Sequence, residues 1–248
     1  EQAWELNQKG RNNVIIGGNL WLKMGNRNIL NAIDLSTLGL DRIEEDESGF
    51  RIGCMATLRD IEMHEGLNKE FQNLFKEAVR HIVGVQFRNC ATVGGSIFPK
   101  LGFSDVLTAF LACDTQVILY KKGEVSLREF IYMPLDNDIL THIYVKKDGR
   151  KTAYESFRMT ETDFPTLTCA MAMVDGRFET VLGARPKHAE VVIDEELADS
   201  LSKEDVASYA KRVIDKLQYG SNIRGSKQYR KQLSKVLISR CISRLTEE

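Results

Sequence analysis

Residues 86–97 place two adjacent glycines between apolar and hydroxyl-bearing residues. The stretch reads Gln86-Phe87-Arg88-Asn89-Cys90-Ala91-Thr92-Val93-Gly94-Gly95-Ser96-Ile97. Glycine permits positive φ, and it lets a ligand approach backbone N–H groups without a Cβ in the way. The hydroxyls of Thr92 and Ser96 add donors, so this segment has the groups needed to hold a phosphate. A Gly-Gly pair is also an ordinary tight turn between strands, and for this stretch taken alone the turn is the favoured interpretation.

A second glycine pair lies upstream, directly after an apolar run that predicts a buried strand. It reads Val14-Ile15-Ile16-Gly17-Gly18-Asn19-Leu20. Neither pair is followed by the Lys-Ser or Lys-Thr of a P-loop, and neither has the third glycine of the Rossmann fingerprint. Two glycine loops without a lysine indicate a diphosphate held between two clusters of amides.

The chain resembles the FAD-binding flavoprotein subunit of the molybdenum hydroxylases, the group that includes xanthine dehydrogenase, carbon monoxide dehydrogenase and 4-hydroxybenzoyl-CoA reductase. The matching runs occur in the family's order and span essentially the whole chain. They are Ile15-Ile16-Gly17-Gly18-Asn19, Ile52-Gly53-Cys54-Met55-Ala56-Thr57-Leu58-Arg59-Asp60-Ile61-Glu62, the run from Arg88 to Ile97, Ser104-Asp105, and Ile223-Arg224-Gly225-Ser226-Lys227-Gln228-Tyr229-Arg230.

This resemblance implies an α+β protein with two parts. Residues 1–148 would form a two-subdomain FAD-binding fold of the PCMH type, and residues 149–248 a small C-terminal domain of three antiparallel strands with helices. It also implies an oxidoreductase subunit that transfers electrons through FAD. Its partners would be an iron–sulfur ([2Fe–2S]) subunit and a molybdopterin-binding large subunit, with NAD or another molecule as electron acceptor.

The resemblance also assigns individual residues to FAD. The residues expected to bind the cofactor are Ile16, Gly17, Gly18, Asn19, Leu20, Ile82, Thr92, Gly94, Gly95, Ser96, Asp105 and Phe164. Asp105 would accept hydrogen bonds from a ribose, because a carboxylate offers two acceptor oxygens to a diol. Ile82 would touch the flavin ring or belong to the core, and both interpretations stay open. The chain departs from the family at Ser96, where asparagine is common, and at Pro165, beside Phe164, where a small residue is usual.

Composition excludes several other classes of protein. The 248 residues are 43% hydrophobic and 28% charged, with a formal net charge of −1, so neither nucleic acid nor an anionic membrane surface is indicated as a partner. No apolar run approaches the roughly 20 residues that span a bilayer. The five cysteines are scattered without Cys-x-x-Cys spacing. They favour a reducing cytoplasm and argue against a zinc or iron–sulfur site on this chain.

Local patterns predict the elements around these loops. Thr57 and Asp60 read as the start of a helix, and apolar spacing predicts another helix over 71–83. Ser104 or Asp105 would cap a short helix. Further along, strands are expected over 152–157, 167–174 and 178–182, followed by helices that begin after residues 202 and 226.

No candidate nucleophile, general base or metal cluster is evident, so we expect the chemistry to belong to the cofactor. Two other functions compete with the electron-transfer subunit. One is a stand-alone FAD-dependent reductase of the UDP-N-acetylenolpyruvylglucosamine reductase type. The other is a binding or assembly module whose loops no longer hold FAD.

Overall fold

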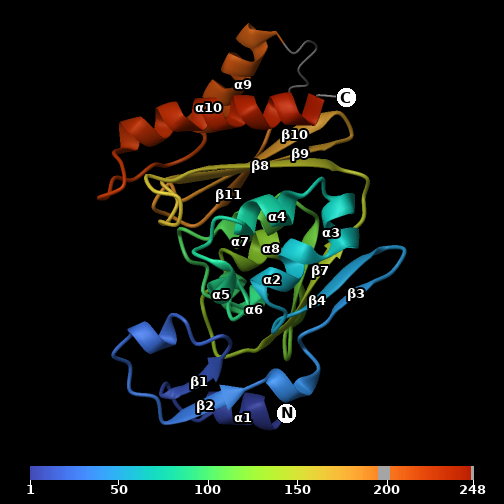
Figure 1. Ribbon diagram of the computed structural model, residues 1–248, viewed down its shortest axis with the longest axis vertical. Coiled ribbons are helices and arrows are strands. Elements are labelled where there is room, and N and C mark those ends of the chain that lie inside the picture. The colour runs from blue at the N-terminus through green and yellow to red at the C-terminus, as the bar shows by residue number, and fades with distance from the viewer. Residues whose placement is uncertain (195–201, 247–248) are drawn as a thin grey trace.

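The computed structural model describes residues 1–194 and 202–246, and its elements form three parts stacked along the long axis (Figure 1). The N-terminal elements lie at one end, a sheet with seven helices lies in the middle, and a second sheet with two long helices lies at the other end. The mixture of helix and sheet agrees with the expected α+β class.

The N-terminal part is a small parallel β-unit that presents the first glycine pair. Strands β1 (Asn13–Ile16) and β2 (Asn31–Asp34) pair in parallel, with α1 (Gln2–Gln8) packed against them. The connections include the 3-10 helices η1 (Leu22–Met24) and η2 (Ser36–Leu38). Gly17 follows β1 directly, and in parallel sheets ligands bind outside the carboxyl ends of the strands.

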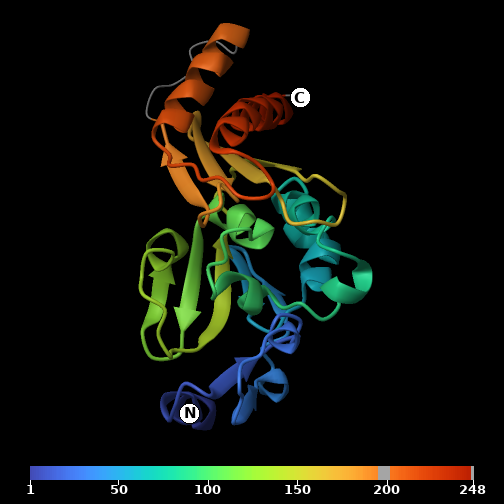
Figure 2. The ribbon, with the colours of Figure 1, turned by 90° about the vertical axis from the view of Figure 1, so that its left-hand side faces the viewer.

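The middle part is an antiparallel five-stranded sheet with short helices beside it (Figure 2). The strand order is β3-β4-β7-β5-β6, formed by Ile43–Glu45, Gly49–Gly53, Leu140–Lys146, Thr115–Leu119 and Gly123–Ser126. The helices are α2 (Leu58–Met63), α3 (Glu65–Glu70), α4 (Leu74–Val79), α5 (Val85–Arg88), α6 (Val93–Ile97), α7 (Asp105–Leu111) and α8 (Leu127–Phe130). The apolar side chains of both layers share one core.

Two helix predictions in this part have different outcomes. Thr57 caps α2 in a capping box, because its hydroxyl accepts from the Asp60 amide and the Asp60 carboxylate accepts from the Thr57 amide. The helix predicted over 71–83 is too long. Left-handed backbone at Gln72 and Asn73 delays the start of α4 to Leu74, and the helix ends at Val79.

The C-terminal part is an antiparallel sheet with one more strand than predicted. The three expected strands are β8 (Lys151–Phe157), β9 (Leu167–Val174) and β10 (Arg177–Gly183), and β11 (Glu190–Ile193) pairs with β10 as a fourth. Because β11 is only four residues long, the sequence pattern was too short to identify it as a strand. Helices α9 (Lys203–Asp215) and α10 (Lys227–Thr246) begin after the predicted caps Ser202 and Ser226.

The C-terminal sheet is buried on both faces. One face forms a core with α9 and α10, and the other packs on α4 and α7 of the middle part. Tyr154, Ala170 and Val181 consequently belong to the core of the middle part. The division into domains at residue 149 stays a prediction.

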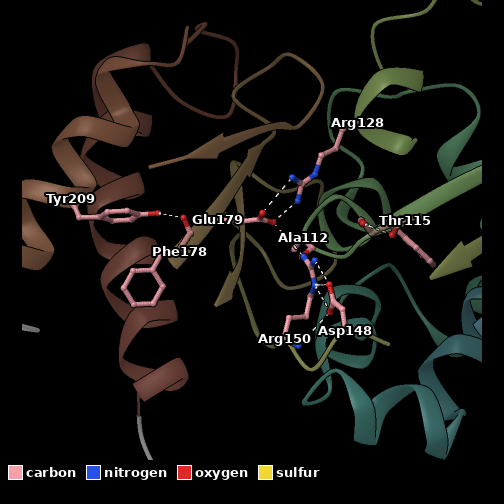
Figure 3. Close-up of polar contacts among 9 residues, drawn as sticks. Ala112, Thr115, Arg128, Asp148, Arg150, Phe178, Glu179 and Tyr209 are labelled. Atoms are coloured by element: carbon pink, nitrogen blue, oxygen red, sulfur yellow. Dashed lines mark hydrogen bonds and ion pairs between the residues drawn. The ribbon is translucent and has the colours of Figure 1, made fainter. Parts of the chain in front are cut away.

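Charged residues also join the two larger parts (Figure 3). The carboxylate of Glu179 on β10 forms ion pairs with Arg128 on α8 and with Arg150, the latter at 3.3 Å. Arg150 also donates to the carbonyl of Ala112 at 2.6 Å and to Asp148. Burial raises the pKa of Asp148, but the hydrogen bonds and charge of Arg150 outweigh it and hold that pKa below its ordinary value. This network ties β10 to the carboxyl end of α7.

Candidate cofactor site

The two glycine loops, which lie more than 70 residues apart in sequence, are in contact. A Cβ on Gly17 would lie 2.5 Å from the hydroxyl oxygen of Thr92, and a Cβ on Gly18 would overlap the carbonyl group of Cys90. Neither of these glycines has a positive φ. Close approach of the two backbones, and not a left-handed conformation, therefore requires glycine at both positions.

The first loop presents unpaired backbone donors. Within the described part of the chain, the amides of Gly18, Asn19 and Leu20 have no protein acceptor. Asn19 is exposed and has left-handed backbone, with φ at 59°. Successive amides at such a bend form a concavity suited to an anion. The loop therefore fits one half of the predicted diphosphate site, and Ile16 supplies the end of the strand on which it is mounted.

The second loop differs from the prediction, because it forms the short helix α6 and its amides are already used. The amides of Val93 and Gly94 donate to the carbonyls of Ala56 and Cys54 at 2.8 and 2.9 Å. Those of Gly95 and Ser96 donate to the hydroxyl and the carbonyl of Thr92. The expectation of an amide cluster is therefore wrong for the second loop, although it fits the first. The second loop instead offers the hydroxyl proton of Thr92 and the exposed backbone of Gly95.

The two glycines of the second loop have unequal surroundings. A Cβ on Gly94 would come within 2.7 Å of both the Cβ and the carbonyl oxygen of Cys54, so this glycine is needed for packing. A Cβ on Gly95 would meet only the Thr92 hydroxyl, at 2.9 Å, and Gly95 is exposed. The Ser96 hydroxyl donates to the Thr92 carbonyl at 2.9 Å. Gly95 is therefore the exposed glycine of this loop, and its contact with FAD stays a prediction.

Asp105 lies close to the second loop but is engaged within the protein. Ser104 caps α7 and donates from its hydroxyl to the Ser96 carbonyl at 3.0 Å. The buried Asp105 carboxylate accepts from the Tyr154 hydroxyl at 2.5 Å and pairs with Arg158 at 2.7 Å. Burial raises the pKa of Asp105, and the charge of Arg158 opposes that change. Its contact with a ribose stays a prediction.

Ile82 is half-buried at the edge of the middle core. Its carbonyl accepts from Arg88 at 3.2 Å, and Arg88 forms a buried ion pair with Glu62 at 2.8 Å. The next residue, Val83, is half-exposed and has a φ of 49°, an uncommon conformation for a β-branched residue. Strained backbone of this kind is often found at functional sites. Both interpretations of Ile82 therefore stay open.

Phe164, from the C-terminal part, lies beside the residue that follows the first loop. It belongs to the segment 158–166 between β8 and β9, which we call the β8–β9 turn. Its ring lies 5.5 Å from that of Trp21 at an angle of 23°, and 4.4 Å from that of Phe103. Trp21 directly follows the first loop, and Phe103 precedes α7. The structure thus brings together three of the predicted regions, in a contact formed by aromatic rings.

Sequence reasoning missed the roles of four residues here. Trp21, which directly follows the first loop, is 45% exposed and faces Phe164. Phe103, Arg158 and Arg224 were not assigned a role at the site. Arg224 lies in the quoted run from Ile223 to Arg230, which was its only signal.

Two further features are absent from the described residues. The described residues contain no group of three or more His, Cys, Asp and Glu side chains able to hold a metal ion. No helix among residues 1–194 and 202–246 is long and apolar enough to span a membrane.

Comparison with known proteins agrees with this geometry. Residues 1–145 match the family described as FAD binding domain in molybdopterin dehydrogenase. The glyceraldehyde dehydrogenase medium chain of Sulfolobus acidocaldarius is 26% identical over 223 residues, which cover 83% of this chain and 79% of that protein.

Two solved structures show the same fold. Quinoline 2-oxidoreductase from Pseudomonas putida 86 superposes with a TM-score of 0.89 at 17% identity, and carbon monoxide dehydrogenase from Hydrogenophaga pseudoflava with 0.85 at 23%. Each match covers 98% of this chain and 93% of the other.

The chain therefore belongs to the family of FAD-binding domains in molybdopterin dehydrogenases. The expected fold, the FAD cofactor and the assignment as an oxidoreductase subunit are confirmed. The individual FAD-binding residues stay predictions.

Proposed function

We propose that this chain is the FAD-binding electron-transfer subunit of a cytoplasmic, multi-chain molybdenum dehydrogenase. The observation that supports it most is the contact of Gly17 and Gly18 with Cys90 and Thr92, which places free amides of the first loop beside the second. Bound FAD would supply the means to accept single electrons and release them as a pair. The chain itself would bind the diphosphate, orient the ring and exclude water.

A partner would supply the electrons, and we infer that it carries the [2Fe–2S] clusters while a large subunit holds the molybdopterin. The similar glyceraldehyde dehydrogenase protein is named a medium chain, which supports a multi-chain assembly. NAD or another acceptor would receive the electron pair.

One face of the chain suits an iron–sulfur partner. Burial lowers the pKa of His81, and the charges of Arg80 and Arg158 lower it further, while Glu161 opposes them. Because Arg158 and Glu161 belong to the β8–β9 turn, residue 81 lies near that turn. Around them, Val83, Val85 and Met159 are 50%, 43% and 61% exposed. Exposed apolar side chains gathered beside a cofactor site are typical of a protein interface. This face also lies next to Ile82 and Phe164.

The test is co-expression with candidate iron–sulfur and molybdenum chains, followed by purification through a tag on this chain. We expect all three to co-purify and the flavin absorbance to bleach when a substrate of the assembly is added. Val85→Asp with Met159→Asp should release the partner, because two carboxylates would be buried without counter-charges. Leu135→Asp, at a residue 59% exposed and outside this face, is the matched control. Turnover of a small substrate with NADH by this chain alone would favour the stand-alone reductase.

A further inference from the structure

Two arginines from different parts of the chain hold the β8–β9 turn. Arg158 lies at the start of the turn and reaches α7, whereas Arg224 lies before α10 and reaches the middle of the turn. Both contact Asp163, the residue before Phe164. The position of Phe164 therefore depends on contacts from both sides.

The Arg158 contacts attach the turn to the middle part. Its Nη2 lies 2.7 Å from Asp105 Oδ2, and its Nε donates to the carbonyl of Asp163 at 3.0 Å. Nη1 donates to Ser156 Oγ at 2.5 Å. The Arg158 and Asp105 side chains are 6% and 5% exposed, so this pair is shielded from water and salt.

The Arg224 contacts attach the same turn to the C-terminal part. Its Nη2 and Nε donate to the Asp163 carboxylate at 2.8 and 3.1 Å. This bidentate pair fixes the orientation of the carboxylate as well as its distance from the guanidinium group. The guanidinium carbon lies 4.9 Å from the centre of the Phe164 ring, within range of a cation–π interaction. Nearby, the buried Arg230 donates from Nε to the carbonyl of Thr166 at 2.9 Å.

We propose that Arg224 is a positioning residue that holds Phe164 against Trp21 at the first glycine loop. Asp163 cannot leave the Arg224 guanidinium without moving the next residue along the chain, and Phe164 also lies under that guanidinium. Arg224 thereby orients the Phe164 ring at the cofactor site, although Arg224 itself does not contact the amides of the first glycine loop. Its significance for FAD rests on the proposed function. The contacts of Arg224 with Asp163 and Phe164, which we call the clamp, are present in the chain without cofactor.

The fluorescence of Trp21 can report whether Arg224 holds Phe164 in place. The chain has two tryptophans, Trp4 and Trp21. In a Trp4→Phe background, the emission of Trp21 alone reports on the Phe164 ring 5.5 Å away. We expect Arg224→Gln to shift this emission to longer wavelength in the same direction as Phe164→Ala, because Trp21 becomes more hydrated. Arg224→Lys should give an intermediate shift, because lysine keeps the charge but loses the planar fork.

The control is Arg240→Gln, at an arginine of α10 whose side chain is 63% exposed and contacts Glu155 at 3.9 Å. It should leave the Trp21 emission unchanged. Far-UV circular dichroism checks that each variant is folded. Arg224 is the residue to change, since its side chain is 25% exposed, whereas removing the buried Arg158 would leave Asp105 unpaired.

A double-mutant cycle on FAD affinity completes the test. Phe164→Ala and Arg224→Gln should each weaken FAD binding about tenfold, and the double variant should be weaker than Phe164→Ala by no more than about twofold, because Arg224 acts through Phe164. Additive losses, or an Arg224→Gln variant with unchanged Trp21 emission, would overturn the proposal. If the wild-type chain failed to bind FAD, the proposed function would fall while the emission measurements still decided the clamp.

Discussion

Gly17 lies directly against Thr92, so close that a Cβ on the glycine would be 2.5 Å from the threonine hydroxyl oxygen. This contact turns two distant loops into one site. The two loops differ in the groups they offer. The first loop has free amides, whereas the amides of the second loop donate within the protein where it forms α6. A diphosphate at this junction would receive backbone donors from the first loop and the Thr92 hydroxyl from the second.

Gly18→Ala should abolish FAD binding or weaken it by about tenfold or more, because the new methyl group would overlap the Cys90 carbonyl and force the loops apart. Gly10→Ala is the matched control, since nothing lies within 4 Å of a Cβ there. FAD titration followed by fluorescence quenching measures both variants. Equal affinities for Gly18→Ala and the wild type would show that loop contact is not needed for binding.

Asp105→Asn should lower the free energy of unfolding by about 3 kcal/mol, because it leaves the buried Arg158 without a counter-charge. Tyr154→Phe removes only one hydrogen bond to the same carboxylate and should cost about 1 kcal/mol. Urea unfolding measures both. If Asp105→Asn is as stable as the wild type but loses FAD, the carboxylate serves the ribose and its ion pair contributes nothing to stability.

Glu179→Gln should destabilise the chain by about 2 kcal/mol, because Arg128 and Arg150 lose their shared carboxylate between the two larger parts. Glu124→Gln, at an exposed position in β6, serves as control. Thermal unfolding followed by circular dichroism also reports on cooperativity. A single transition in the wild type that splits into two in Glu179→Gln would show that this network couples the parts, whereas unchanged curves would contradict that role.

Stability should fall as the pH drops from about 7 to about 5, the range in which histidine titrates. Burial lowers the pKa of His142, the charge of Arg51 lowers it further, and Glu44 opposes them. The unfolded chain then binds protons at a higher pH than the folded chain does, so protonation favours unfolding. His142→Gln should flatten this part of the curve of unfolding free energy against pH. The same slope in the variant and the wild type would assign the effect to other groups, such as His81, whose pKa is also lowered by burial.

Local signals in the sequence predicted most elements, because capping residues and apolar periodicity act over a few positions. Thr57, Ser104, Ser202 and Ser226 all cap the helices expected of them. Left-handed backbone at Gln72 and Asn73 carries no comparable signal in the sequence, so the start of α4 was misplaced. The four-residue β11 depends on its pairing with β10, which is a tertiary effect.

The sequence nominated residues for the candidate site, but it did not show how those residues are arranged. The glycine pairs indicated a diphosphate, and the family resemblance implied FAD. The hydrogen bond from the Gly94 amide to the Cys54 carbonyl, in contrast, depends on how residues 54–58 pack beside the second loop. The contact of Trp21 with Phe164 joins residues 143 positions apart and has no local signature. Asp105 was expected at a ribose, whereas the structure gives both of its oxygens partners from β8 and the turn that follows it.

The most direct test of the two-loop site is calorimetric titration of the purified full chain with FAD and, separately, with FMN. Both ligands contain the isoalloxazine ring, but only FAD contains the diphosphate. If the junction of Gly17–Gly18 with Thr92 holds that diphosphate, FAD should bind at least about 100-fold more tightly, as expected from losing two or more charge-assisted hydrogen bonds. Equal affinities, or tighter binding of FMN, would contradict a diphosphate site between the two loops.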